Sequence, residues 1–139
     1  MSCVFCRIVA GDEPAHIAFS DDVAVGFLDT RPLFHGHVLL VPRAHVETLT
    51  DLAPDSVGPL FERAQRLAAA AVEALGAQGS FVAMNNRVSQ SVPHLHVHVV
   101  PRTKGDGLRG FFWPRTTYDS AEQAEEIAQR IRTVVQPDA

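Results

Sequence analysis

The most regular hydrophobic pattern in the chain runs from residue 55 to residue 75. Apolar side chains recur there at intervals of three and four residues over five turns, while charged and amide side chains fill the other positions. The apolar set comprises Val57, Leu60, Phe61, Ala64, Leu67, Ala68, Ala71, Val72 and Leu75. This periodicity predicts a long amphipathic helix that covers a hydrophobic layer, and Gly76 is suited to end it.

Shorter apolar runs bounded by turn residues predict five strands, at residues 16–19, 23–28, 37–41 and 80–84 and in the histidine stretch that follows the loop 85–93. Pro42 closes the third run, and Pro101, which has no N–H to donate, is expected to end the fifth. A C-terminal helix is expected to begin at Ser120, because Ser120 and Gln123 match a capping box. Since short turns join most of the strands, we expect an α+β fold with two helices and a largely antiparallel five-stranded sheet.

The fifth run contains three of the chain's seven histidines, at every second position. His94, His96 and His98 alternate there with Leu95, Val97 and Val99. Because successive side chains of a strand point to opposite faces, the three imidazoles are expected to share one face. A solvent-exposed strand face is the simpler interpretation, but such faces usually mix Thr, Lys, Glu and Ser. Three imidazoles in a row indicate acid–base chemistry or metal binding.

Composition limits the partners and the location that we expect. The 139 residues are 46% hydrophobic and 20% charged, as in an ordinary globular domain, and their formal net charge is −4. We therefore expect no binding to nucleic acid or to an anionic membrane, and an anionic ligand must meet a local positive site. The chain has neither a signal-peptide pattern nor an apolar run of membrane-spanning length, so the expected location is cytoplasmic.

The two cysteines form a C-x-x-C pair at Cys3 and Cys6. A cytoplasmic location favours reduced or metal-bound cysteines over a disulfide. A redox pair would normally follow a strand and open a helix, and no strand is expected before Cys3. Half of a zinc site would need two further ligands, which His45 and His94 could supply. Two buried thiols without a ligand are the remaining alternative.

Taken together, these residues resemble the histidine triad (HIT) family, and its Hint-like branch more than its fragile-histidine-triad branch. PHLHVHVVPR matches the signature His-φ-His-φ-His-φ-φ, where φ is apolar. The blocks VFCRIVAGDEPAH and FLDTRPLFHGHVLLVPRAH, and Asn85 with SQSV, support the match in order along the chain. The resemblance implies a HIT-like fold, with a single domain over residues 1–139, a core at 3–101 and a C-terminal extension at 102–139. It also implies a homodimer with one continuous ten-stranded sheet.

The resemblance further implies an activity. The family hydrolyses or transfers nucleotides at the α-phosphate of phosphoramidates, dinucleoside polyphosphates and related purine nucleotide conjugates. By motif position, His96 attacks phosphorus and forms a covalent nucleotidyl-histidine intermediate, and His98 and Ser91 assist. A neutral imidazole suits this role because it is a good nucleophile near pH 7 and a good leaving group. An acceptor such as a backbone carbonyl should hold its other nitrogen as N–H.

Nucleotide-binding positions follow from the same resemblance, and they are Phe5, Ile8, Phe27, Asp29, Asn85 and Gln90. The three apolar residues match the lining of the base pocket, although core packing alone could explain them. The aspartate matches an acid that binds the ribose hydroxyls, and its alternative role is that of a turn residue before Arg31-Pro32. The two amides match positions on the phosphate side, where simple turn chemistry is the alternative for the asparagine.

The metal site is also given by resemblance. Hint-like bacterial proteins that carry this cysteine pair resemble galactose-1-phosphate uridylyltransferase in binding a structural zinc through two Cys and two His. The implied ligands of Zn²⁺ are Cys3, Cys6, His45 and His94. In that case His94 would orient His96 rather than take part in catalysis. Two other functions stay open: a nucleotide-binding regulatory protein with negligible turnover, and a metal-binding module that uses all three triad histidines.

Two features depart from the family pattern. Ser89 stands in a shortened loop where the family usually has glycine, and a positive φ there would strain serine. The segment Thr103–Tyr118 lies outside the family core. It could fold over the substrate, form a dimer contact, or close the edge of the sheet as an aromatic cluster.

Overall fold

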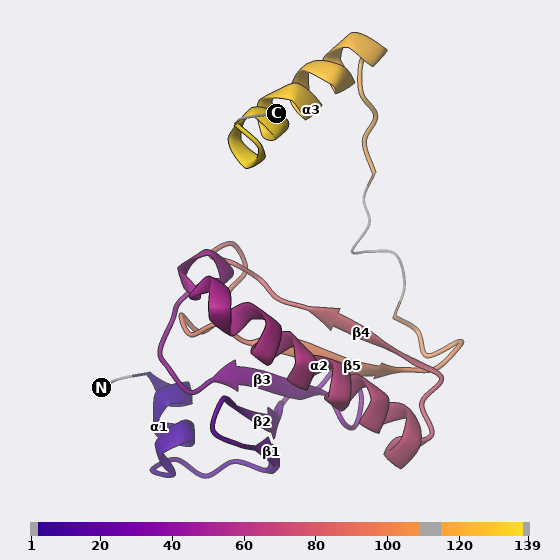
Figure 1. The fold of residues 1–139 in the computed structure, drawn as a ribbon. Helices are drawn as coiled ribbons and strands as arrows, with labels where there is room; N and C mark the ends of the chain where they lie inside the picture. The colour runs from indigo at the N-terminus through magenta and orange to yellow at the C-terminus, as the bar shows by residue number, and fades with distance from the viewer. Residues whose placement is uncertain (1–2, 109–114, 138–139) are drawn as a thin grey trace. The chain divides into compact units, whose positions relative to one another are not determined.

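The computed structural model describes residues 3–108 and 115–137 and places them in two compact units, residues 1–106 and 107–139. The first unit contains a five-stranded sheet in the order β1-β2-β3-β5-β4, with every neighbouring pair antiparallel (Figure 1). Its strands are β1 Ile17–Ser20, β2 Ala24–Leu28, β3 Val38–Pro42, β4 Gly79–Ala83 and β5 Val97–Arg102. The expected α+β fold with an antiparallel five-stranded sheet is therefore confirmed.

The long helix α2, Pro54–Leu75, covers one face of this sheet (Figure 1). Pro54 stands in its first turn, and Gly76 ends it in the left-handed conformation with φ 71°, as the sequence predicts. Leu60 and Ala64 pack there against Leu40 and the buried residues of the histidine segment. The apolar stripe of α2 continues to the end of the helix, where its side chains are less covered. Val72 and Leu75 in the last turn are 45% and 59% exposed.

A short helix that the sequence analysis does not predict, α1 (Val4–Ala10), packs on the opposite face. Its Phe5 joins a second buried cluster with Val25, Phe27, Leu39 and Val41. β2 and β3 therefore bury both of their faces, and this explains why they read as continuous apolar runs rather than as alternating ones. The expectation of only two helices was wrong, because the described residues contain three α-helices and a 3-10 turn at Leu49–Asp51.

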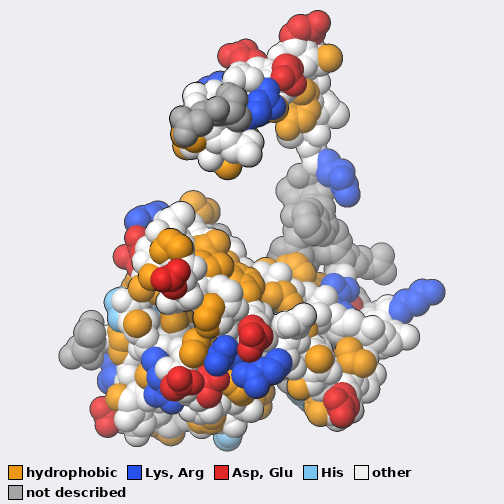
Figure 2. Space-filling model, viewed as in Figure 1, with side chains coloured by type: hydrophobic (Ala, Val, Ile, Leu, Met, Phe, Trp, Pro, Cys, Tyr) orange, Lys and Arg blue, Asp and Glu red, His pale blue; other side chains and the backbone are white. Residues whose placement is uncertain are grey.

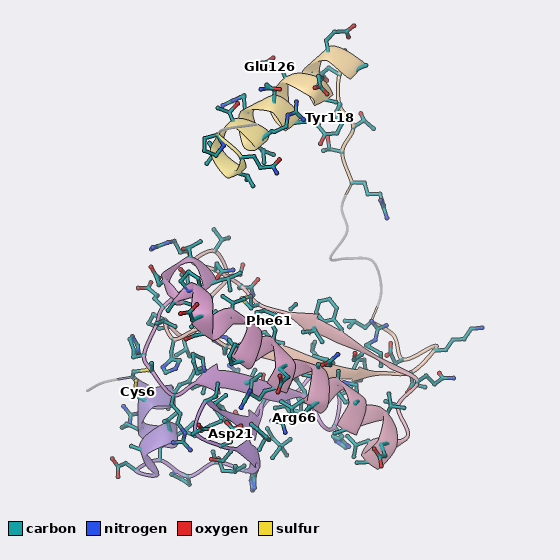
Figure 3. The ribbon with its side chains drawn as sticks, viewed as in Figure 1. Cys6, Asp21, Phe61, Arg66, Tyr118 and Glu126 are labelled. Carbon is teal, nitrogen blue, oxygen red and sulfur yellow. The ribbon has the colours of Figure 1, made fainter. Side chains whose placement is uncertain are left out.

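Ion pairs link α2 to the β1–β2 hairpin (Figures 2 and 3). Asp21 Oδ1 accepts the backbone N–H groups of Val23 and Ala24, so that Asp21 forms the expected turn. Its Oδ2 lies 2.9 Å from Arg63 Nε and 3.6 Å from Arg66 Nη2. Arg66 also lies over the Phe19 ring, 5.1 Å from its centroid, which is a cation–π distance.

The second unit contains α3, Ala121–Val135, capped as predicted by Ser120, whose hydroxyl accepts the N–H of Gln123. The expected reciprocal bond of the capping box differs, because Gln123 Oε1 accepts from Asp119 N instead of Ser120 N. Part of the segment Thr103–Tyr118, including Arg109 and Trp113, lies outside the described residues. In the described chain, no helix combines the length and the apolar character that crossing a membrane requires.

Candidate functional site

The histidine segment enters the sheet later than predicted. Of the three triad histidines, only His98 lies within β5, and residues 91–96 form bends and irregular chain outside the sheet. The ladder between β3 and β5 stops at the pair Leu40–Val97, although β3 continues to Pro42. Leu95 N–H instead donates to Val46 O at 2.8 Å. The predicted alternation is kept, since Leu95, Val97 and Val99 are all buried against α2.

The expected end of β5 at Pro101 was wrong by one residue. Pro101 pairs with Ser80 of β4 inside the strand. Pairing with β3 extends only to Val99, so β5 has no β3 neighbour at the proline. A residue without an N–H is tolerated where one side of a strand has no ladder to complete.

Four side chains converge beside α1 and form what we call the cysteine–histidine cluster: Cys3, Cys6, His45 and His94. His94 Nδ1 lies 3.5 Å from each sulfur and 3.2 Å from His45 Nδ1, which is 3.2 Å from Cys6 Sγ. Zn–N bonds near 2.05 Å and Zn–S bonds near 2.3 Å place tetrahedral ligands roughly 3.3–3.8 Å apart. The donor set and spacing therefore fit a four-coordinate metal ion, and the structure brings together all four residues named from the sequence.

Helix α1 and the backbone of β3 position the side chains of the cysteine–histidine cluster. Cys3 is the N-cap of α1, and its Sγ accepts the N–H of Cys6 at 3.4 Å. Cys6 lies in the first turn, so both sulfurs belong to the N-terminal end of the helix, where Figure 3 labels Cys6. Burial, followed by the Cys3 thiol, raises the pKa of Cys6, and a bound cation would oppose this by favouring the thiolate. His94 is fully buried, and its Nε2–H donates to Pro42 O at 3.0 Å. Burial lowers the pKa of His94, so the neutral ring directs its Nδ1 lone pair at the cluster.

His96 has one engaged and one open ring nitrogen. Its Nδ1–H donates to the carbonyl oxygen of His94 at 2.8 Å, which leaves Nε2 with the lone pair. The hydrogen bond of this ring within the described residues is made by Nδ1, and the ring lines a cavity into which Nε2 can present its lone pair. The edge of Phe5 packs on it with ring centroids 5.2 Å apart. A backbone carbonyl thus holds the tautomer that a nucleophile needs, as expected from the sequence.

His98 belongs to a second group, the aspartate–histidine cluster of Asp29, His37 and His98. His37 Nδ1 accepts the N–H of Leu33 at 3.1 Å, so the neutral ring carries its proton on Nε2, which lies 2.9 Å from His98 Nδ1. His98 Nδ1 is then the acceptor, and His98 Nε2 carries the remaining proton. Burial, followed by the neighbouring histidines, lowers the pKa of His98 to about 4, and burial also lowers the pKa of His37. Both rings are neutral at pH 7.

Sequence reasoning missed His37 as a functional residue. It stands one position before β3 and lies opposite Asp29, which follows β2 in the same hairpin. Asp29 N–H donates to His37 O at 2.9 Å, and Asp29 Oδ2 lies 3.8 Å from His37 Nε2. The signal in the sequence is the hairpin register, which places a histidine across from a candidate ribose ligand. Asp29 is also the turn residue of the alternative interpretation, because its Oδ1 accepts Arg31 N–H at 2.9 Å.

A cavity of about 380 Å³ opens between α1 and the histidine segment. Its predicted wall residues are Phe5, Ile8, Phe27, Asp29, Ser91, His96 and His98. Its other wall residues are Val4, Glu13, Pro14, Ala15, Leu28, Thr30, Arg31, Leu39 and Val92. Apolar side chains thus form one part of the wall, and the imidazoles, the aspartate and the serine form another.

Asn85 and Gln90 lie in the loop ahead of the triad and are not among the described residues that line this cavity. Asn85 Nδ2 donates to Ser89 O at 3.2 Å, and Gln90 Nε2 donates to Glu47 O at 2.6 Å. These bonds support a loop in which Arg87 and Ser89 have φ values of 70° and 61°. Ser89 thus has the left-handed conformation that glycine adopts without strain.

Known proteins resemble this chain in sequence and in fold. The HIT domain family model matches residues 10–105. An adenylylsulfatase of Arabidopsis thaliana is 35% identical over 108 residues, which are 76% of this chain and 55% of that protein, so the chain spans about half the length of this relative. An adenosine 5′-monophosphoramidase of Schizosaccharomyces pombe is 30% identical over 137 residues, 95% of this chain and 100% of that protein.

Among solved structures, a zinc-bound histidine triad family protein from Mycobacterium smegmatis superposes with a TM-score of 0.75 and 38% identity, covering 99% of both chains. A Bacillus subtilis HIT family protein superposes with a TM-score of 0.85 and 28% identity, covering 96% of both chains. Family model, relatives and fold agree with the histidine pattern, and this chain belongs to the HIT domain family.

Proposed function

We propose that this protein is a nucleotidyl hydrolase or transferase that cleaves purine nucleotide conjugates at the α-phosphate through a covalent intermediate on His96. The observation that carries the proposal is the free Nε2 of a His96 ring whose Nδ1–H is held by the His94 carbonyl, at the wall of a cavity large enough for a small ligand. Relatives named as an adenylylsulfatase and an adenosine 5′-monophosphoramidase support the same chemistry.

In the first step, the Nε2 lone pair attacks the α-phosphorus, a P–N bond forms, and the bond to the leaving group breaks. The ring becomes positively charged, and its Nδ1–H becomes a stronger donor. The His94 carbonyl oxygen 2.8 Å away accepts this proton more strongly as charge develops. The same contact thus sets the tautomer before the attack and stabilises the charged ring after it.

His98 acts as a neutral hydrogen-bond donor to the phosphoryl oxygens. Its pKa of about 4 means that Nε2–H donates a hydrogen bond without giving up the proton. His37 holds His98 in this tautomer through the 2.9 Å contact between the rings. The Ser91 hydroxyl, at the same wall, donates a further hydrogen bond. This arrangement favours leaving groups such as sulfate and phosphate, which depart without needing a proton.

In the second step, water attacks phosphorus from the side opposite the P–N bond. The P–N bond breaks, His96 leaves as a neutral imidazole, and the water proton passes to solvent. Two in-line displacements give net retention at phosphorus. Asp29 accepts hydrogen bonds from the ribose hydroxyls, and Phe5, Ile8 and Phe27 enclose the base. The amides of Asn85 and Gln90 act through the shape of the phosphate-side loop.

The cysteine–histidine cluster is proposed to hold a structural Zn²⁺. Its ligand spacing and the zinc-bound Mycobacterium smegmatis relative support this assignment. When bound, zinc supplies a rigid cross-link and no reacting atom. Cys3 and Cys6, at the start of α1, would hold it together with His45 and His94, and the carbonyl of His94 orients His96.

A homodimer with a ten-stranded sheet is part of the same proposal. The outer strands of the sheet are β1 and β4, so two copies can extend the sheet through either edge. Sedimentation at several concentrations tests this, because a monomer at all concentrations would contradict it.

The proposed function is tested by turnover of an adenosine phosphoramidate, adenylyl sulfate and diadenosine polyphosphates. We expect His96→Ala to lose at least about 10⁴-fold in kcat while it still binds AMP. The matched control is His16→Ala, which removes an exposed imidazole outside the cavity. A wild type that binds AMP but turns over none of these substrates would identify a regulatory nucleotide-binding protein instead.

A further inference from the structure

The cavity has a carboxylate that the proposed chemistry does not use. We propose that Glu13 makes this site select guanine over adenine, which rests on the proposed function and adds a base preference to it. Glu13 lines the same cavity as His96 and lies beside apolar wall residues from α1 and from the segment that follows it.

Helix α1 sets the distance between Glu13 and the reaction centre. Phe5, near its start, contacts the ring of His96, and the helix ends at Ala10. The five steps from Phe5 to Ala10 rise about 7.5 Å along the helix axis. Gly11 then turns the chain with φ 84°, and Glu13 N–H donates to Arg7 O at 3.3 Å. Glu13 is thereby held beside the end of the helix that is remote from His96, where a nucleotide with its α-phosphate at His96 would place its base.

Glu13 is partly shielded and still available for a ligand. Its side chain is 40% exposed and forms an ion pair with Arg7, whose Nε lies 3.8 Å from Oε2. At that distance the pair involves no hydrogen bond, so the carboxylate oxygens can still accept from a ligand. The other acid of the described cavity wall, Asp29, already accepts the N–H of Arg31. Since Asp29 is assigned to the ribose, Glu13 supplies the remaining carboxylate of the described wall, and it can meet the edge of a base.

The chemistry of the two purines decides the preference. A carboxylate can only accept hydrogen bonds, and its two oxygens match two adjacent donors. Guanine presents such a pair on its Watson–Crick edge, N1–H and the 2-amino group. Adenine presents a single amino group next to the N1 lone pair, which would face the carboxylate with like charge. A site whose polar group stays unpaired with the wrong ligand discriminates more than an apolar pocket does.

The test compares guanosine and adenosine 5′-phosphoramidates on the full-length protein. We expect kcat/KM for the guanosine substrate to be higher by roughly tenfold, the scale of one bidentate base contact. Glu13→Gln should bring the ratio to within about threefold of unity or below it. The carboxamide oxygen can accept only part of the guanine donor pair, and the amide matches the amino group and N1 of adenine. Inosine, which keeps N1–H and lacks the 2-amino group, should fall between the two. Glu62→Gln, at an exposed carboxylate on α2, is the matched control and should keep the wild-type ratio.

Titration calorimetry with GMP and AMP separates this inference from the proposed function. If no phosphoramidate is turned over but GMP binds more tightly and Glu13→Gln removes the difference, the base preference stands without the enzymatic proposal. Equal binding of GMP and AMP by the wild type, or a guanosine preference that survives in Glu13→Gln, would overturn the role of Glu13.

Discussion

The cysteine–histidine cluster and the aspartate–histidine cluster lie on either side of His96, and one five-residue segment supplies a histidine to each. Both clusters contain residue types that bind metals. In the first, the nitrogens of His45 and His94 are 3.2 Å apart and two sulfurs complete a tetrahedral set. In the second, the two imidazole nitrogens approach to 2.9 Å, which is a hydrogen-bond distance.

The difference lies in the protons on the ring nitrogens. In the cysteine–histidine cluster, the Pro42 carbonyl takes the His94 proton on the far side of the ring, so the lone pair points inward. In the aspartate–histidine cluster, the Leu33 amide engages the far nitrogen of His37, so a proton points inward. Backbone groups outside each cluster thus decide whether the same side chain offers a metal a lone pair or offers a neighbour a proton. His96 belongs to neither group.

The largest expected effect is on the cysteine–histidine cluster. Cys6→Ser should lose the roughly one zinc per chain that we expect in the wild type and about 3 kcal/mol or more of stability, because structural zinc binding contributes directly to folding. For a chain of this size the melting temperature should fall by about 10 °C or more. Elemental analysis and calorimetry measure both quantities.

The aspartate–histidine cluster serves as the control for that experiment. A variant of His37 should keep its zinc, since His37 contacts His98 and none of the four ligands. A wild type that contains no zinc, or a Cys6→Ser variant with an unchanged melting temperature, would remove the distinction between the two clusters.

The next effect is kinetic. His37→Phe keeps a ring of similar size but cannot donate to His98, so His98 is free to adopt the wrong tautomer or to rotate. We expect kcat to fall by about 10- to 100-fold, the usual range for a residue that orients a functional group, with a smaller change in KM. Steady-state kinetics on a phosphoramidate measures the loss.

His37→Gln tests the reason for that loss. Its side-chain amide can donate N–H to His98 Nδ1, so it should recover part of the activity that His37→Phe loses. Equal activity of the two variants would show that ring packing, and not the hydrogen bond, is what His37 contributes.

The last expected effect is on the pH dependence of stability, where the change is small near neutral pH and grows as the pH falls. The pKa of His98 is about 4 in the folded protein and near 6.5 in the unfolded chain. Between these values the unfolded chain binds the extra proton, so stability is full above about pH 6.5 and declines as the pH falls toward 4. Urea unfolding at several pH values should show a shallower decline in His98→Gln than in the wild type or in His16→Ala. Identical profiles for all three proteins would contradict the buried neutral ring.

Local pattern was sufficient for most of the fold. The expected strands at 23–28 and 37–41 correspond to Ala24–Leu28 and Val38–Pro42, and the helix ends at Leu75 as the position of Gly76 predicts. These features depend on side-chain period and on turn residues, which neighbours in sequence determine. Helix α1 was missed because seven residues are too few to show a helical period. The continuous apolar character of β2 and β3 was the available sign of a second covering layer.

The site was predictable in its parts and not in its connections. Residue types and spacing indicated the cysteine pair, His45 and His94, which the fold brings together. The contact between His37 and His98 joins residues 61 positions apart, and it depends on strand order and hairpin register. The resemblance put the amides of Asn85 and Gln90 on the phosphate side of the site. In the structure they instead donate to the backbone oxygens of Ser89 and Glu47 and do not line the described cavity.

The fixed tautomers have a spectroscopic consequence. Three imidazole N–H protons sit in hydrogen bonds of 3.0, 2.8 and 2.9 Å, on His94, His96 and His37 respectively. All three rings are buried, so these protons exchange with water only when the site opens locally. Two of them face carbonyl oxygens and one faces a ring nitrogen, which gives them different chemical environments. Their resonances in the downfield proton spectrum would report separately on His96 and on each of its two neighbouring clusters.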